Sequence, residues 1–261
     1  MSKHSLDLTS SQQWNLAWDQ VDPFELVDPS KSFDRCLAKE LDNHLIYSNN
    51  LDRTAFEVGC APGKWLAHIC SKYGYIPHGI DYSDTGIVKT YERFKRNKLA
   101  NPELVLGDFR KLISKERYDL VYSLGFIEHF NDPEEIFRLH VNLLKPGGLL
   151  VIGVPNFQGI NKIIQQHLNP GTLDDHNLNI MNHDWFLDRA AIEGLTHITT
   201  RYIGSYEPAL PVPPHQERYR SLRYLPFKIA IKLALVVRRS NLMDRVNHPA
   251  FSSYLLSVYK A

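Results

Sequence analysis

Residues 54–63, TAFEVGCAPG, decide the fold of this 261-residue chain. The pattern over 54–60 predicts a buried strand that runs directly into a glycine turn. Gly59 and Gly63, with the small Ala61 between them, let a ligand approach the backbone. The helix predicted over 65–73 offers free N–H groups at its N-terminus, where an anionic or nucleotide ligand binds well. The stretch alone predicts a nucleotide-like ligand, and dinucleotide-binding enzymes use a similar turn.

Strands and helices alternate after this turn. Further strands are predicted over 77–82, 103–107, 118–124 and 149–154, with helices over 84–97 and 133–144. Such alternation implies right-handed βαβ units and a parallel sheet covered on both faces. Two late strands, 195–206 and 252–259, predict an antiparallel pair at the sheet edge. The expected fold is α/β and Rossmann-like: seven mostly parallel strands with an antiparallel late edge strand, an N-terminal helical extension and a late helical insertion.

The chain divides into four segments on this pattern. We expect an N-terminal helical cap over 1–50, a ligand-binding core over 51–206, an insertion over 207–250 and a final strand over 251–261. The insertion is too long for a plain hairpin loop, and we expect it to form a lid or a surface helix. In the first segment Trp14, Trp18 and Phe24 fit two uses, closure over a bound ligand or plain core packing.

Composition narrows the class of protein. Hydrophobic residues make up 43% and charged residues 23%, which is ordinary for a globular chain, and a net charge of +1 gives no support to a nucleic-acid partner. Three cysteines without CxxC spacing argue against a zinc site or a disulfide framework, and free thiols predict a reducing, cytoplasmic setting. The polar start predicts no signal peptide, and no apolar run reaches the length of a membrane span. The spacing of His167, His176 and His183 is irregular, so no metal site is predicted.

The acidic residues in and after the first three strands indicate whether the ligand is a dinucleotide or S-adenosylmethionine. Glu57 lies inside the first strand, where a carboxylate is close to a cationic group rather than to a pyrophosphate. Asp81 ends the second strand, where it can accept both ribose hydroxyls. Asp108 follows the third strand and can accept from an adenine amino group, with Phe109 packed beside the ring. This set favours S-adenosylmethionine over a dinucleotide; the alternative for Glu57 is a structural acid that bonds loop amides.

These residues resemble the motifs of class I S-adenosylmethionine-dependent methyltransferases. The run YDLVYSLGFIEHF, 118–130, is similar to the family's fourth-strand motif, and LLKPGG, 143–148, is similar to the motif before its fifth strand. The resemblance covers residues 54–156 and implies S-adenosylmethionine as cofactor, with Tyr82 and Ser123 added to the cofactor-binding set. Ala61 stands where the family has the middle glycine of its first motif.

Three residues are candidates for catalysis. Glu128 and His129 follow the fourth strand at the carboxyl edge of the sheet, and His176 lies in the stretch after the fifth strand. An oxygen acceptor of high pKa needs a nearby base, and an imidazole suits that task. We expect His129 or His176 to be the base. The stretch 154–181 resembles small-molecule methyltransferases of glycan, natural-product and quinone pathways, which implies a small hydroxylated acceptor.

Other interpretations remain open at this point. A NAD-dependent oxidoreductase and a cofactor-binding module without catalysis share the same turn. A nucleic-acid methyltransferase is disfavoured because the chain has no basic stripe. Residues 224–239, YLPFKIAIKLALVVRR, are apolar with flanking lysine and arginine. Three uses fit them: peripheral membrane contact, a buried lid helix, or the contact of a homodimer.

Overall fold

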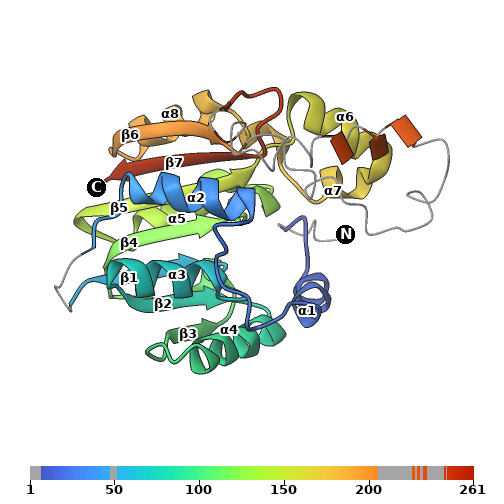
Figure 1. The fold of residues 1–261 in the computed structure, drawn as a ribbon. Helices are drawn as coiled ribbons and strands as arrows, with labels where there is room; N and C mark the ends of the chain where they lie inside the picture. The colour runs from blue at the N-terminus through green and yellow to red at the C-terminus, as the bar shows by residue number, and fades with distance from the viewer. Residues whose placement is uncertain are drawn as a thin grey trace, which may run out of the picture.

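A seven-stranded sheet forms the centre of this computed structural model, over the residues that it describes (Figure 1). Those residues are 7–47, 52–204 and 246–261, with 225, 226, 228, 229, 232, 233 and 244 as isolated positions. The strands are β1 (Thr54–Val58), β2 (Ile76–Asp81), β3 (Glu103–Leu106), β4 (Tyr118–Leu124), β5 (Leu144–Pro155), β6 (Thr196–Ile203) and β7 (Tyr254–Lys260). They lie in the order β3-β2-β1-β4-β5-β7-β6.

The direction of the strand order reverses beside β1. From β1 the chain moves outward to β2 and β3, and then returns to place β4 and β5 on the other side. Pairs among β1 to β5 are parallel, whereas β7 runs antiparallel to both β5 and β6, which gives the expected antiparallel pair at that edge. In a doubly wound sheet the crevice at such a reversal, outside the carboxyl ends of the strands, is where ligands bind.

Helices cover both faces of this sheet. They are α1 (Ser11–Asp19), α2 (Ser32–Asp42), α3 (Lys64–Tyr73), α4 (Asp84–Arg96), α5 (Pro133–Val141), α6 (Gly159–Leu168), α7 (Pro170–Asp174) and α8 (His183–Ile192), with short turns η1 (Phe109–Lys111), η2 (Ile127–His129) and η3 (Leu178–Ile180). Leu120 joins the buried cluster under α2, α3 and α4, and its neighbour Val121 joins the cluster under α5 and α8. The two side chains point apart because successive residues of a strand alternate between faces. The predicted Rossmann-like fold with helices on both faces is confirmed.

Local capping explains where two of the helices begin. The Ser83 hydroxyl accepts a hydrogen bond from the Gly86 amide at 2.9 Å and caps α4. Pro133 stands in the first turn of α5, and the Asp132 side chain accepts from the Glu135 amide at 3.0 Å. Both caps lie at the carboxyl edge of the sheet or at the turns that follow it.

Two boundaries differ from the sequence prediction. Helix α5 ends at Val141 rather than near 144, and β5 begins at Leu144 rather than at 149. The cause is a register shift: Tyr118 pairs with Leu144 but Leu120 pairs with Leu149, and the extra residues form a bulge in which Gly147 has φ 77°. The sequence analysis also assigned no helix to 157–192, where the structure has α6, α7 and α8.

The terminal segments have different positions. Of the two N-terminal helices, α2 lies on the sheet face, and α1 packs against α4 near the carboxyl ends of the strands (Figure 1). Most of the predicted insertion 207–250, including most of 224–239, lies outside the described residues. Within the part of the chain that the structure describes, no helix has the length and apolar character to cross a membrane.

Candidate functional site

The floor of the site is the turn between β1 and α3. Gly59 has φ 71°, and a Cβ there would lie 2.5 Å from a ring carbon of Phe126. Gly63, the N-cap of α3, has φ 81°, and a Cβ there would lie 2.5 Å from Thr90. Positive φ and close neighbours therefore both require glycine at these two positions.

Asp81 ends β2 directly beside this turn. Its carboxylate accepts hydrogen bonds from the amides of Ala61 at 3.1 Å and Ser83 at 2.8 Å. The side chain is 7% exposed, and burial raises its pKa to about 6 although these amides act in the opposite direction. The carboxylate therefore holds the glycine turn in place and still faces the crevice, where its remaining lone pairs are available to ligand hydroxyls.

A pocket opens above the turn. Its empty space, including the open mouth, is about 520 Å³. Predicted cofactor residues Gly59, Ala61, Asp81 and Tyr82 line it, and so does the catalytic candidate His129. The other lining residues are Asp7, Thr9, Trp14, Trp18, Leu124, Gly125, Phe126 and Phe130. One pocket thus joins the predicted cofactor residues to the predicted acceptor side.

A smaller cavity of about 280 Å³, mouth included, adjoins this pocket, and Asp81, Asp108 and Phe109 line it. The Asp108 carboxylate accepts from Arg110 Nε at 3.0 Å and from an Arg110 terminal nitrogen at 2.9 Å. Burial raises the pKa of Asp108, but the hydrogen bonds and charge of Arg110 outweigh it, and the pKa lies below its ordinary value. Arg110 also pairs with Asp7 at 2.6 Å. Asp108 is therefore an ionised acceptor at the place expected for an adenine amino group.

Three predicted cofactor residues do not line either cavity: Glu57, Gly63 and Ser123. Glu57 is 5% exposed and lies inside the sheet, where the Tyr122 hydroxyl donates to its Oε2 at 3.1 Å. Burial raises the pKa of Glu57 well above its ordinary value, and the hydrogen bond from Tyr122 opposes that rise only in part. This environment matches the structural role that the sequence analysis left open for Glu57; a ligand contact stays a prediction.

His129 stands at the far end of the main pocket, on η2. Its Nδ1 lies 2.8 Å from the carbonyl oxygen of Asp175, so Nδ1 carries the hydrogen and donates, which leaves Nε2 with a lone pair. Burial lowers the pKa of His129 to about 4, which keeps the ring neutral at pH 7. The edge of Trp14 packs against it, with ring centroids 5.2 Å apart.

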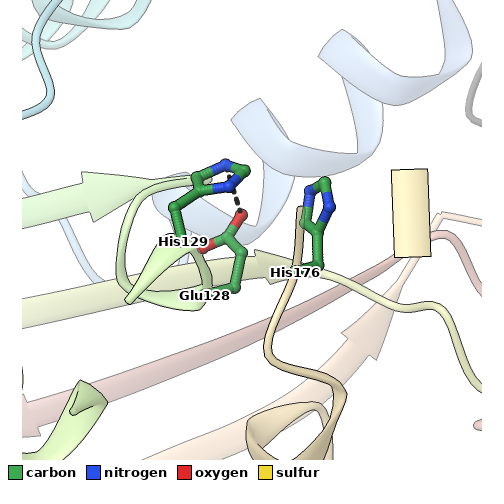
Figure 2. A group of neighbouring side chains, drawn as sticks. All are labelled: Glu128, His129 and His176. Atoms are coloured by element: carbon green, nitrogen blue, oxygen red, sulfur yellow. Dashed lines mark ion pairs between the residues drawn. The ribbon is translucent and has the colours of Figure 1, made fainter. Parts of the chain in front are cut away.

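Glu128, His129 and His176 come together behind this pocket (Figure 2). Nε2 of His129 lies 3.8 Å from Oε1 of Glu128, and the two imidazole centroids are 4.5 Å apart. Burial raises the pKa of Glu128 to about 8, and burial together with His129 lowers the pKa of His176 to about 3. The structure thus brings all three predicted catalytic residues into one cluster, although His176 is far from the other two in sequence.

The N-terminal segment forms part of the pocket lining. Trp14 and Trp18 stack with centroids 5.1 Å apart and both line the pocket, as the lid hypothesis expects. Phe24 does not: its side chain is 58% exposed and lies under the Arg96 guanidinium. The amide of Leu8 donates to the His129 carbonyl at 2.8 Å, which ties this segment to η2. Asp7 and Thr9 were missed by the sequence analysis because no local pattern marks a residue that reaches the site from a distant segment.

Comparison with known proteins identifies the fold. A family model described as a methyltransferase domain matches residues 56–152. Over 96% of this chain, at 18% identity and a TM-score of 0.59, the structure is similar to 57% of a phosphoethanolamine N-methyltransferase 2 of Haemonchus contortus that was solved with S-adenosyl-L-methionine. At that identity the likeness shows the fold alone.

Two curated relatives carry more specific names. A ubiquinone biosynthesis O-methyltransferase of Coxiella burnetii is 24% identical over 144 residues, which are 55% of this chain and 56% of the relative. A malonyl-[acyl-carrier protein] O-methyltransferase of Haemophilus ducreyi is 26% identical over 124 residues, 44% of this chain and 48% of the relative. The chain thus spans about half the length of the curated relatives that it matches.

Proposed function

We propose that this chain, a class I S-adenosylmethionine-dependent methyltransferase, transfers the methyl group to a hydroxyl oxygen of a small molecule. The observation that carries the proposal is the continuity of one pocket from Asp81 to His129. A carboxylate suited to a ribose stands at one end, and a neutral imidazole suited to a hydroxyl stands at the other. The methyl group of the cofactor has to lie between them for direct transfer.

The cofactor half needs little chemistry from the protein. The open backbone at Gly59 and Ala61 admits the ligand, and Asp81 accepts its ribose hydroxyls. Asp108 and Phe109 receive the adenine from the adjoining cavity. S-adenosylmethionine brings an activated methyl group, so the protein contributes orientation and exclusion of water. Trp14 and Trp18 supply that exclusion from above the pocket.

The acceptor half rests on His129 and His176. Each ring is fixed by a hydrogen bond from Nδ1 to a backbone carbonyl, of Asp175 and of Thr172. Each therefore offers Nε2 as a hydrogen-bond acceptor toward a hydroxyl. His129 lines the pocket itself, which makes it the first candidate for the group that orients the hydroxyl and takes its proton. His176 is the second.

Oxygen is favoured over nitrogen by the imidazoles beside the pocket. A neutral amine needs no base before attack, whereas a hydroxyl of high pKa does, and two imidazole acceptors serve a hydroxyl. The relatives do not separate the two atoms, because the two described above are named O-methyltransferases, whereas a relative of Rauvolfia serpentina at 27% identity over 123 residues is named a norajmaline N-methyltransferase. A cofactor-binding module without catalysis remains the second candidate function, because it would use the same cofactor residues around Gly59 and Asp81.

Calorimetric titration of the purified chain tests the cofactor. We expect S-adenosylmethionine and S-adenosylhomocysteine to bind one per chain and NAD to give no response. Binding of NAD with no response to either sulfur ligand would falsify the proposal.

A panel of hydroxylated quinones, phenols and sugars then tests the acceptor, with release of S-adenosylhomocysteine as the readout. His129→Ala and His176→Ala are compared at saturating cofactor, with the exposed His167→Ala as matched control. We expect turnover to fall in the first two variants and to persist in the third. If both cluster variants keep full turnover, neither imidazole is the base. Cofactor binding without release from any acceptor supports the non-catalytic module.

A further inference from the structure

The cluster behind the pocket has the chemistry of a metal site. We propose that Glu128, His129 and His176 bind one divalent transition-metal ion beside the methyl donor. One side-chain ligand atom from each residue lies within 4.8 Å of the other two, in the only such three-residue group among the described residues. The sequence analysis predicted no metal, because it considered His176 with His167 and His183 rather than with residues of η2.

The separations suit a shared ion. Imidazole nitrogens and carboxylate oxygens lie about 2.0–2.2 Å from zinc, which places two ligands of one ion roughly 3–4 Å apart. Nε2 of His129 and Oε1 of Glu128 are already 3.8 Å apart. The widest separation in the group, up to 4.8 Å, closes with a side-chain shift of about 1 Å. No backbone rearrangement is required.

Both imidazoles have the outer partners that metal-binding histidines have. Nδ1 of His129 is 2.8 Å from the carbonyl oxygen of Asp175, and Nδ1 of His176 bonds the carbonyl oxygen of Thr172. Such bonds fix the tautomer and the ring orientation, so that Nε2 presents its lone pair to the ion. Trp14 packs edge-on against His129 and Phe157 against His176, which limits the movement of each ring.

Glu128 supplies an independent indication of a ligand. Its side chain is 1% exposed, and Oε2 has no hydrogen-bond partner among the described residues. A buried carboxylate oxygen without a partner is rare and calls for an explanation such as an ion. Figure 2 shows this carboxyl group directed toward the His129 ring, with His176 beside them. A cation at the point where the three side chains meet is bound by Oε1, the oxygen that faces His129, and its charge offsets that of the buried carboxylate.

The ligand set selects the class of ion. Two imidazoles and one carboxylate suit Zn²⁺, Fe²⁺, Co²⁺ or Ni²⁺, whereas Mg²⁺ and Ca²⁺ prefer a shell of oxygen atoms. Three protein ligands leave at least one coordination position open, as in catalytic rather than structural sites. Because His129 lines the pocket, an open position there is available to a substrate oxygen.

The role of the ion rests on the proposed function, and in it the ion takes the place of the imidazole base, because Nε2 of His129 and of His176 coordinates the ion. An acceptor hydroxyl that binds the ion has a lower pKa, so its O–H bond breaks more readily and the proton leaves to solvent. The oxygen then forms a bond to the methyl carbon while the carbon–sulfur bond breaks, and the electron pair of that bond stays on sulfur. The products are the methyl ether and S-adenosylhomocysteine, and no other reactant is required.

Metal titration of the chelator-treated protein tests the site without any acceptor. We expect Zn²⁺ and Co²⁺ to bind one per chain by calorimetry. His176→Ala and Glu128→Gln should each weaken binding at least about tenfold, the lower end of what even outer-shell substitutions cost. His167→Ala, an exposed histidine of α6 outside the cluster, is the matched control and should bind as the wild type does.

A second measurement avoids the variants. In the Co²⁺-loaded wild type, imidazole proton resonances shifted by the metal report two histidine ligands whether or not a variant folds. Absence of ion binding at millimolar concentration, or unchanged affinity in both cluster variants, overturns the inference. Titration of the same samples with S-adenosylhomocysteine separates the two proposals: intact cofactor binding without ion binding refutes only the metal site, and the reverse result refutes only the proposed function.

Discussion

Substitution of Asp81 by asparagine is the most direct test of the cofactor site. The carboxylate is the predicted acceptor for the ribose hydroxyls, and it also receives the amides of Ala61 and Ser83. Asparagine keeps the shape but replaces one oxygen with an NH₂ group and removes the charge. A hydrogen bond to a charged group is worth about 1.5–3 kcal/mol, so we expect S-adenosylhomocysteine to bind roughly 10- to 150-fold more weakly.

Affinity should also depend on pH through the same residue. Burial raises the pKa of Asp81 to about 6, and protonation of the carboxyl removes an acceptor for the ribose. Wild-type affinity should therefore fall as pH is lowered through about 6, whereas the affinity of Asp81→Asn should change little there. In the absence of ligand, Asp81 gives folding stability the opposite dependence on pH. The folded carboxyl holds its proton to a higher pH than its ordinary pKa of 3.8, so the free energy of unfolding falls as pH rises from 3.8 to about 6.

Calorimetric titration with S-adenosylhomocysteine between pH 5 and 8 measures the affinity of each protein and its dependence on pH. Asp84→Asn is the control, because Asp84 is an exposed aspartate at the start of α4. The control should bind as the wild type does at every pH. Equal affinities of Asp81→Asn and wild type at pH 7.5 would show that the ribose lies elsewhere. An equal slope with pH in the two proteins would show that another group titrates.

Three further substitutions test other parts of the site. Tyr122→Phe should lower the free energy of unfolding by about 1–3 kcal/mol in urea titrations, because the Glu57 carboxyl loses the hydrogen bond from the Tyr122 hydroxyl. Cofactor affinity should stay unchanged, and a large loss of affinity would instead indicate that Glu57 contacts the ligand. Gly59→Ala should destabilise the fold by about 1–3 kcal/mol and weaken cofactor binding, since φ is 71° and Phe126 occupies the space; wild-type melting and binding would contradict this. Trp14→Ala should speed release of S-adenosylhomocysteine in stopped-flow measurements, because the indole lines the pocket and stacks on Trp18; an unchanged release rate would rule out a lid.

Local patterns were sufficient for the order of elements and for the cofactor residues at the strand ends. The alternation of strand and helix predicts the parallel sheet, and the strand ends of a parallel sheet meet at one edge. The positions of Gly59, Asp81 and Asp108 at three strand ends therefore predict that these residues lie together. The boundary of β5 was missed because the bulge near Gly147 depends on how two strands pair, which no single strand records.

Local sequence patterns also do not predict whether a side chain lines the pocket or is buried beneath it. Glu57 stands two residues before Gly59, and sequence alone cannot distinguish a carboxylate that faces the ligand from one that lies beneath it. The structure places Glu57 inside the sheet against Tyr122, because its side chain follows the alternation of β1 rather than the direction of the turn.

The sequence by itself determined the Rossmann-like fold, the glycine turn and the acidic residues around it, because short-range periodicity and turn chemistry specify these features. Only the tertiary structure decided that His176 lies against Glu128 and His129, and that Trp14 packs against His129. Those contacts join segments from three parts of the chain, and they depend on the packing of α1 against α4 and of α7 against α6, and on hydrogen bonds to the carbonyls of Thr172 and Asp175. The spacing of residues along the chain does not predict that these three segments come together.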